Sequence, residues 1–139
     1  IISNPHLRRD KVVVFMNYPI HLWILERALD EHEIPYAIYT GSESSKLRSA
    51  HLKRFAESDD CNVLIISKVG ATGLNLWFAR ILIVMDPLWS ALDDHQLIGR
   101  VARYMQKDWA IVYRLVAQNS IDVILNQISV GKQDMHDAF

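Results

Sequence analysis

A buried-strand pattern followed by a glycine-containing turn occupies residues 63–76, which read VLIISKVGATGLNL. The first part, Val63–Ser67, is a nearly continuous apolar run, as expected for a strand of a parallel sheet that is covered on both faces. Gly70 and Gly73 follow directly, and such a turn after a buried strand is a common phosphate-binding feature of α/β proteins. The segment therefore predicts a parallel sheet with a binding edge at the carboxyl ends of its strands.

Strand and helix patterns alternate on both sides of this segment. Strands are expected at residues 12–15, 36–39, 63–66, 81–85 and 110–116, and helices at 20–32, 45–56, 93–103 and from 121 to 128. Strands separated by helices predict right-handed crossovers and a mainly parallel sheet in a three-layer α/β/α sandwich. The segments Ser67–Gly73 and Asp86–Trp89 should then converge on one edge of the sheet.

Composition predicts one domain over residues 1–139. Half of the residues are hydrophobic and 22% are charged, which disfavours disorder. A net charge of −1 is no nucleic-acid signature, so any DNA contact must come from a local patch. The single Cys61 and six scattered histidines predict no metal site, and no apolar run approaches the roughly 20 residues that span a membrane. The chain begins without methionine, so we expect a piece of a larger protein.

A second pattern, QxxGRxxR, covers residues 96–103. Arg100 and Arg103 would lie on one face of a helix and present two guanidinium groups, which match the oxygens of a polyphosphate. The alternative is that both are surface charges paired with nearby acidic residues, Asp93, Asp94 or Asp108. The order of Gln96, Gly99 and the preceding glycine turn favours phosphate contact.

Three segments, GATGLNL at 70–76, MDPLW at 85–89 and QLIGRVARYMQ at 96–106, together resemble motifs V and VI of superfamily 2 helicase motors. They look most like those of the Swi/Snf-type chromatin-remodelling and DNA-repair ATPases, whose motif VI reads roughly QxxxRxxRxGQ. Residues 11–17 resemble motif IV of this family, and residues 39–55 the segment after it. The resemblance covers nearly the whole chain, and it implies a RecA-like C-terminal lobe.

The resemblance also implies roles for individual residues. Arg100 and Arg103 would be arginine fingers that reach the γ-phosphate of ATP held by a partner lobe. Gln96, Gly70, Gly73 and Asn75 would couple this nucleotide site to bound DNA. The residues expected at the DNA backbone are Thr40, Gly41, Ser42, Lys46, Ser67, Lys68 and Thr72. For the Thr40–Ser42 turn, a plain capped turn is an equally good interpretation.

Two motifs that ATP hydrolysis requires are missing from the sequence: the GxxxxGK[ST] phosphate-binding loop and the DExx-type acid cluster that holds Mg²⁺. We therefore expect ATP and Mg²⁺ to be bound mainly by an N-terminal RecA-like lobe of the same protein. The chain would be the C-terminal motor lobe of a nuclear, ATP-dependent translocase acting on double-stranded DNA or nucleosomes. The isolated fragment should be inactive.

Three alternatives remain open. Ala71, Ala102 and Met105 depart from the family pattern, which favours a hydrolysis-degenerate regulatory or DNA-binding lobe in a multidomain chromatin or DNA-modifying protein. An RNA helicase lobe is also considered, although the DEAD-box family normally has His where Gln96 stands. An unrelated doubly wound nucleotide-binding domain is disfavoured, because residues 17–19 lack a glycine fingerprint. The four tryptophans are expected in the core or at an inter-lobe surface rather than stacked on bases.

Overall fold

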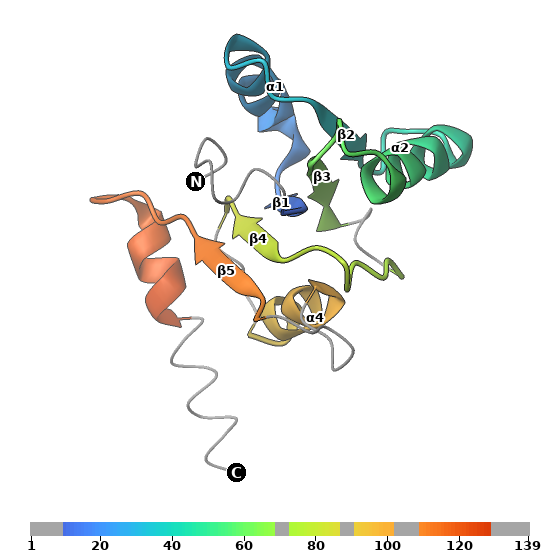
Figure 1. The fold of residues 1–139 in the computed structure, drawn as a ribbon. Helices are drawn as coiled ribbons and strands as arrows, with labels where there is room; N and C mark the ends of the chain where they lie inside the picture. Colours follow the sequence, from blue (N-terminus) through green and yellow to red (C-terminus); the bar gives the residue numbers. More distant parts are fainter. Residues whose placement is uncertain (1–9, 69–72, 87–90, 102–108, 129–139) are drawn as a thin grey trace.

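The computed structural model describes residues 10–68, 73–86, 91–101 and 109–128, with the backbone alone for 91–94. The described residues form one parallel five-stranded sheet in the order β2-β3-β1-β4-β5 (Figure 1). Its strands are β1 (Val12–Met16), β2 (Tyr36–Tyr39), β3 (Val63–Ser67), β4 (Ile81–Val84) and β5 (Ile111–Arg114). The helices are η1 (Pro19–His21), α1 (Leu22–Glu31), α2 (Ser45–Glu57), α4 (Ala91–Val101) and an unlabelled helix at 121–128.

The three inner strands confirm the interpretation of the apolar runs. Every residue of β1, β3 and β4 is buried, since each of these strands has a neighbour on both sides and is covered on both faces. Unbroken runs of Val, Ile and Leu suit this position, because neither face meets water.

Several predicted boundaries differ from those of the structure, and two of the differences have a clear physical reason. The helix expected from residue 20 begins as the 3₁₀ turn η1, because Pro19 leads it and Tyr18 provides no side-chain cap. The strand expected at 110–116 spans only Ile111–Arg114, because β5 pairs only with β4 in the described sheet, and β4 offers four residues for pairing. Helix α4, expected at 93–103, is described from Ala91 to Val101.

The direction of each crossover explains which helix covers which face (Figure 1). From β1 to β2 the chain moves one way along the sheet, whereas every later connection moves the other way. Right-handed crossovers therefore place α1 on one face, and α2 and α4 on the other. The two core clusters agree: Leu29 of α1 packs in one, while Phe55 of α2 and Leu97 of α4 pack in the second. The predicted three-layer sandwich is confirmed.

Candidate functional site

Two predicted DNA-backbone segments meet at the carboxyl edge of the sheet. Tyr39 of β2 pairs with Ile66 of β3, so Thr40 and Ser67 follow on neighbouring strands. Both side chains are buried, with 2% and 3% of their surface exposed, whereas Lys68 is exposed. The exposed residues at this edge are thus the ones available to a ligand, and Thr40 and Ser67 support them from the interior.

The turn after β2 is closed by its own side chains. The Thr40 and Ser42 hydroxyl oxygens are 2.8 Å apart and share a hydrogen bond. Ser44 then caps α2, since its hydroxyl accepts a hydrogen bond from the backbone N–H of Leu47 at 3.3 Å. Gly41, Ser42 and Lys46 are exposed around this helix start, so their backbone and side-chain donors are accessible.

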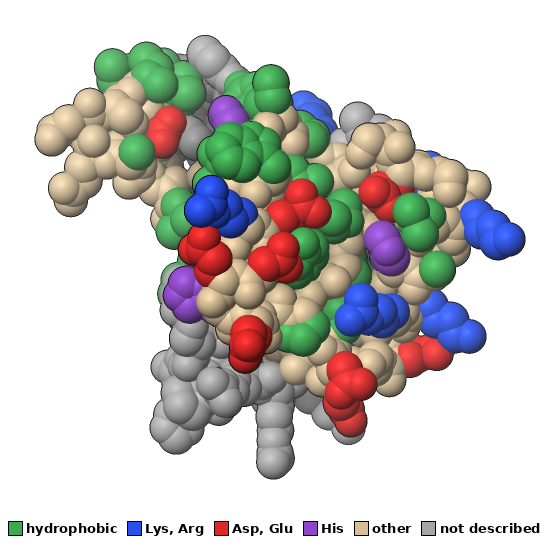
Figure 2. Space-filling view, turned by 90° about the horizontal axis from the view of Figure 1, so that it is seen from above, with side chains coloured by type: hydrophobic (Ala, Val, Ile, Leu, Met, Phe, Trp, Pro, Cys, Tyr) green, Lys and Arg blue, Asp and Glu red, His purple; other side chains and the backbone are tan. Residues whose placement is uncertain are grey.

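Helix α2 supplies a local positive charge that the net charge of the chain does not reveal. Its sequence contains four basic side chains, Lys46, Arg48, Lys53 and Arg54, and one acidic side chain, Glu57. Lys and Arg side chains are visible on the side of the molecule formed by α2, at the right of Figure 2. Of these, Lys46 and Arg48 lie near the start of α2, beside the Thr40–Ser42 turn, whereas Lys53 and Arg54 lie towards its far end.

The loop after β3 is bonded to α4 at two points. The backbone N–H of Leu76 donates to the carbonyl of Arg100 at 3.0 Å, and the Arg100 guanidinium donates to the carbonyl of Leu74 at 3.5 Å. Leu74 and Leu76 are buried, while Asn75 between them is exposed. Gly73 has a φ of +83°, a conformation that glycine adopts readily. Gly70 and Thr72 lie outside the described residues.

Helix α4 separates a packing side from an accessible side. Leu97 and Val101 are buried, whereas Gln96 is exposed and Arg100 is half-buried. Gln96 and Arg100 are four residues apart and so share one side of the helix. Arg103 lies outside the described residues.

Asp86 is a site residue that our sequence analysis missed. Its Oδ2 accepts hydrogen bonds from the backbone N–H groups of Asn17 at 2.9 Å and Tyr18 at 3.3 Å. β1 and β4 are neighbours whose connections leave in opposite directions, which is where doubly wound sheets usually bind ligands. In this structure the Asp86 carboxylate already accepts hydrogen bonds from the N–H groups of Asn17 and Tyr18, so these two donors are not offered to a ligand. The signal available in the sequence was a carboxylate shortly after an apolar strand pattern, in the Asp86–Trp89 segment expected at this edge of the sheet.

Replacing Asp86 with alanine should therefore lower the free energy of unfolding by about 2 kcal/mol, because two backbone donors lose their acceptor. The measurement is urea denaturation of the chain. Asp86→Asn is the matched control, and it should lose less than half as much, because its amide oxygen still accepts. Equal losses in both variants would contradict this account of the hydrogen bonds.

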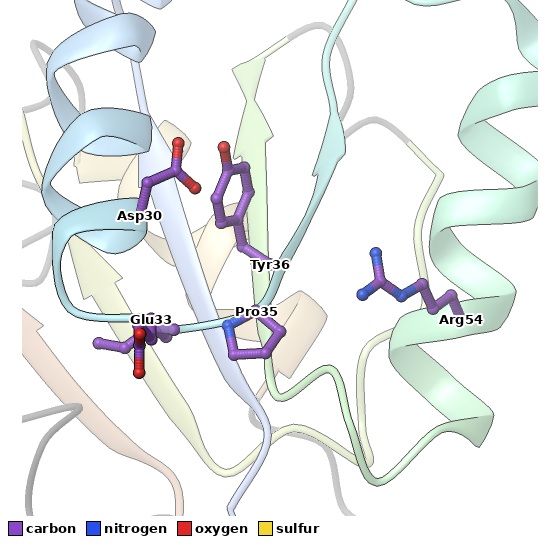
Figure 3. Close-up of a pocket in the computed structure, with 6 residues that line it drawn as sticks. Asp30, Glu33, Pro35, Tyr36 and Arg54 are labelled. Atoms are coloured by element: carbon purple, nitrogen blue, oxygen red, sulfur yellow. The ribbon is translucent and has the colours of Figure 1, made fainter.

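An open cavity of about 370 Å³ lies at the opposite, amino edge of the sheet (Figure 3). Its lining residues are Asp30, Glu33, Ile34, Pro35, Tyr36 and Arg54. Burial, followed by the nearby carboxylates of Glu26 and Asp30, raises the pKa of the Tyr36 hydroxyl above its usual value. None of the predicted site residues lines this cavity.

The tryptophans are not core residues where they are described. Trp23, Trp77 and Trp109 expose 61%, 47% and 90% of their surface. Of the two positions expected for them, the core is therefore excluded, and an inter-lobe surface stays a prediction. Trp89 lies outside the described residues. Within the described part of the chain, no group of three or more His, Cys, Asp or Glu side chains is arranged to hold a metal ion, and no helix is long and apolar enough to cross a membrane.

Comparison with known proteins agrees with this arrangement. The model of the helicase conserved C-terminal domain matches residues 2–105. The chain belongs to this family. This chain is 36% identical over 124 residues to DNA repair protein rad8 of Schizosaccharomyces pombe. The match covers 88% of this chain and 11% of that protein. The chain is also 36% identical over 128 residues to the DNA repair and recombination protein RAD54-like of Drosophila grimshawi, covering 91% of this chain and 16% of that protein.

A solved structure supports the same assignment. The C-terminal part of the Fun30 ATPase domain superposes with a TM-score of 0.83 at 26% identity, over 92% of this chain and 41% of that one. The predicted RecA-like fold and the predicted membership of the Swi/Snf-type superfamily 2 ATPases are both confirmed. The lobe spans only a small part of its curated relatives, 11% of rad8 and 16% of the RAD54-like protein.

Proposed function

We propose that this lobe is the C-terminal half of the motor of a nuclear, ATP-dependent translocase that acts on double-stranded DNA or nucleosomes. The observation that best supports the proposal is the pair of hydrogen bonds joining the 73–76 loop to Arg100. They connect residues 74–76, which follow Lys68 in the sequence, with the helix expected at the nucleotide. A change at one end can therefore move the other.

On the nucleotide side, Arg100 and Arg103 would contact the terminal phosphate of ATP. The N-terminal lobe would bind Mg²⁺ and the ATP, whose hydrolysis would drive the motor. The chemistry of the described residues fits this division. Arg100 offers a half-buried guanidinium on the accessible side of α4, which suits contact with a phosphate. Gln96, one turn earlier on the same side, would transmit the state of the nucleotide.

On the DNA side, Gly41, Ser42, Lys46 and Lys68 would contact backbone phosphates. All four are exposed, and their N–H, hydroxyl and ammonium donors read phosphate rather than base edges. Binding should therefore be independent of sequence. Lobe closure on ATP and opening after hydrolysis would then move this backbone track along the duplex.

Lys68→Ala in the intact motor protein tests the DNA side. It should weaken binding to all duplexes alike and lower the slope of log K against log salt concentration by roughly one unit, because one lysine–phosphate contact is lost. Fluorescence anisotropy on two unrelated duplexes at several salt concentrations measures both effects. Lys53→Ala is the control, since Lys53 is exposed on α2 and pairs with Glu57 at 3.9 Å. An unchanged slope for Lys68→Ala, or a loss on one duplex only, would move the DNA track elsewhere.

A further inference from the structure

One side chain spans the Thr40–Ser42 turn and contacts the chain on both sides of it. Nδ1 of His51, on α2, lies 2.7 Å from the carbonyl oxygen of Ile38, just before the turn. The same nitrogen lies 3.5 Å from Oε2 of Glu43, just after the turn. Because a carbonyl oxygen only accepts hydrogen bonds, Nδ1 carries the ring hydrogen and donates a hydrogen bond to the Ile38 carbonyl.

The Glu43 contact involves a largely buried carboxylate. Oε2 of Glu43 is buried and makes no hydrogen bond among the described residues, and the whole side chain is only 19% exposed. A buried carboxylate oxygen is unfavourable unless a positive or polar group compensates it. Nδ1 of the His51 imidazole, 3.5 Å away, is the polar group that the structure places beside this oxygen, and the His51 side chain is itself 27% exposed.

The Ile38 contact stabilises the other side of the turn. Strand β2 lies at the edge of the described sheet, where β3 is its neighbour on one side only. The bond from His51 reaches β2 from α2 and ties the end of this strand to the helix that follows the turn. Arg48 of α2 adds a second link, with its guanidinium carbon 5.5 Å from the centre of the Tyr39 ring.

We propose that His51 is a positioning residue for DNA binding, which sets the conformation of the Thr40–Ser42 turn by holding Ile38 on one side and Glu43 on the other. This inference rests on the proposed function, in which the turn contacts the DNA backbone. His51 itself touches no DNA in this account. It fixes where the exposed donors of Gly41 and Ser42 point.

The test uses the intact motor protein and measures DNA affinity by anisotropy together with DNA-stimulated ATP turnover. His51→Leu should raise the DNA concentration for half-maximal binding roughly fivefold, as the loss of one hydrogen bond would, and leave turnover at saturating DNA within about twofold. His51→Asn should restore affinity to within about twofold of wild type, because its amide N–H donates from nearly the position of Nδ1.

His32→Leu is the matched control. His32 makes the same kind of bond, from Nδ1 to the carbonyl of Ala28 at 2.8 Å, but it lies at the end of α1. Its loss should leave DNA affinity unchanged.

The outcomes separate this inference from the proposed function. If Lys68→Ala weakens binding but His51→Leu does not, the positioning role is overturned and the DNA track stands. A folded His51→Asn variant that binds DNA about fivefold more weakly than the wild type would also overturn it, and this comparison holds even if His51→Leu fails to fold. If neither Lys68→Ala nor His51→Leu changes affinity, the DNA contacts proposed for this edge are wrong.

Discussion

Replacing Arg100 or Arg103 with alanine in the intact motor protein is expected to lower kcat by on the order of 10³, while ATP binding stays nearly unchanged. The reason is that a guanidinium at the terminal phosphate stabilises charge that develops only in the transition state. The lysine substitutions should rescue poorly, because an ammonium cannot reproduce the planar, two-pronged hydrogen bonding of arginine. The measurement is ATP turnover at saturating ATP and DNA.

The structure makes this experiment interpretable for Arg100. Its link to Leu76 uses the backbone carbonyl, which an alanine retains, so among the hydrogen bonds to described residues the variant loses the 3.5 Å side-chain bond to Leu74. Arg27→Ala is the control, since Arg27 pairs with Glu31 on the exposed surface of α1 and should leave turnover unchanged. Turnover like that of the wild type in both Arg100→Ala and Arg103→Ala would show that these are ordinary surface charges.

The largest loss of stability is expected from Phe55→Ala, at about 3–5 kcal/mol in the free energy of unfolding. Phe55 is fully buried on the inner side of α2, its ring centre is 5.6 Å from that of Phe78, and the Lys11 ammonium lies 5.6 Å from its centre. Truncation leaves a cavity between α2 and the sheet. A loss of this size is a large fraction of the stability of a domain this small.

Chemical denaturation of the chain measures this loss, with Trp23→Ala as the control. Trp23 is also a large aromatic residue, but it is 61% exposed, so its truncation should change the free energy of unfolding by less than about 0.5 kcal/mol. A Phe55→Ala variant about as stable as the control would mean that α2 does not depend on this contact. The Thr40–Ser42 turn would then need other support.

Much of the fold could be predicted because its signals are local. The apolar runs at β1, β3 and β4 are compatible only with strands covered on both faces, and the regular return of helical patterns between them leaves few arrangements other than a parallel sheet. The helix expected at 45–56 is found as α2, Ser45–Glu57, and its cap Ser44 is a local signal in the same sense.

The site was predictable only in part. The sequence placed Ser67 and Lys68 at the end of a strand and Arg100 on a helix, but it contained no sign that Thr40 and Ser67 would be buried and Lys68 exposed. That difference depends on which strands become neighbours, since β2 and β3 are adjacent and bring Thr40 against Ser67. Strand order is a property of the whole sheet and not of any one segment.

The sequence by itself determined the family, the parallel α/β fold and the order of the motifs, because residue type and spacing are sufficient for each of these. Only the tertiary structure decided which side chains hold the site together. Asp86 bonds to the backbone of Asn17 across 69 residues, His51 bonds to Ile38 across 13, and Arg100 bonds to Leu74 across 26. Such bonds form wherever the register and the crossovers bring a donor within about 3 Å of an acceptor, and no local propensity records that distance.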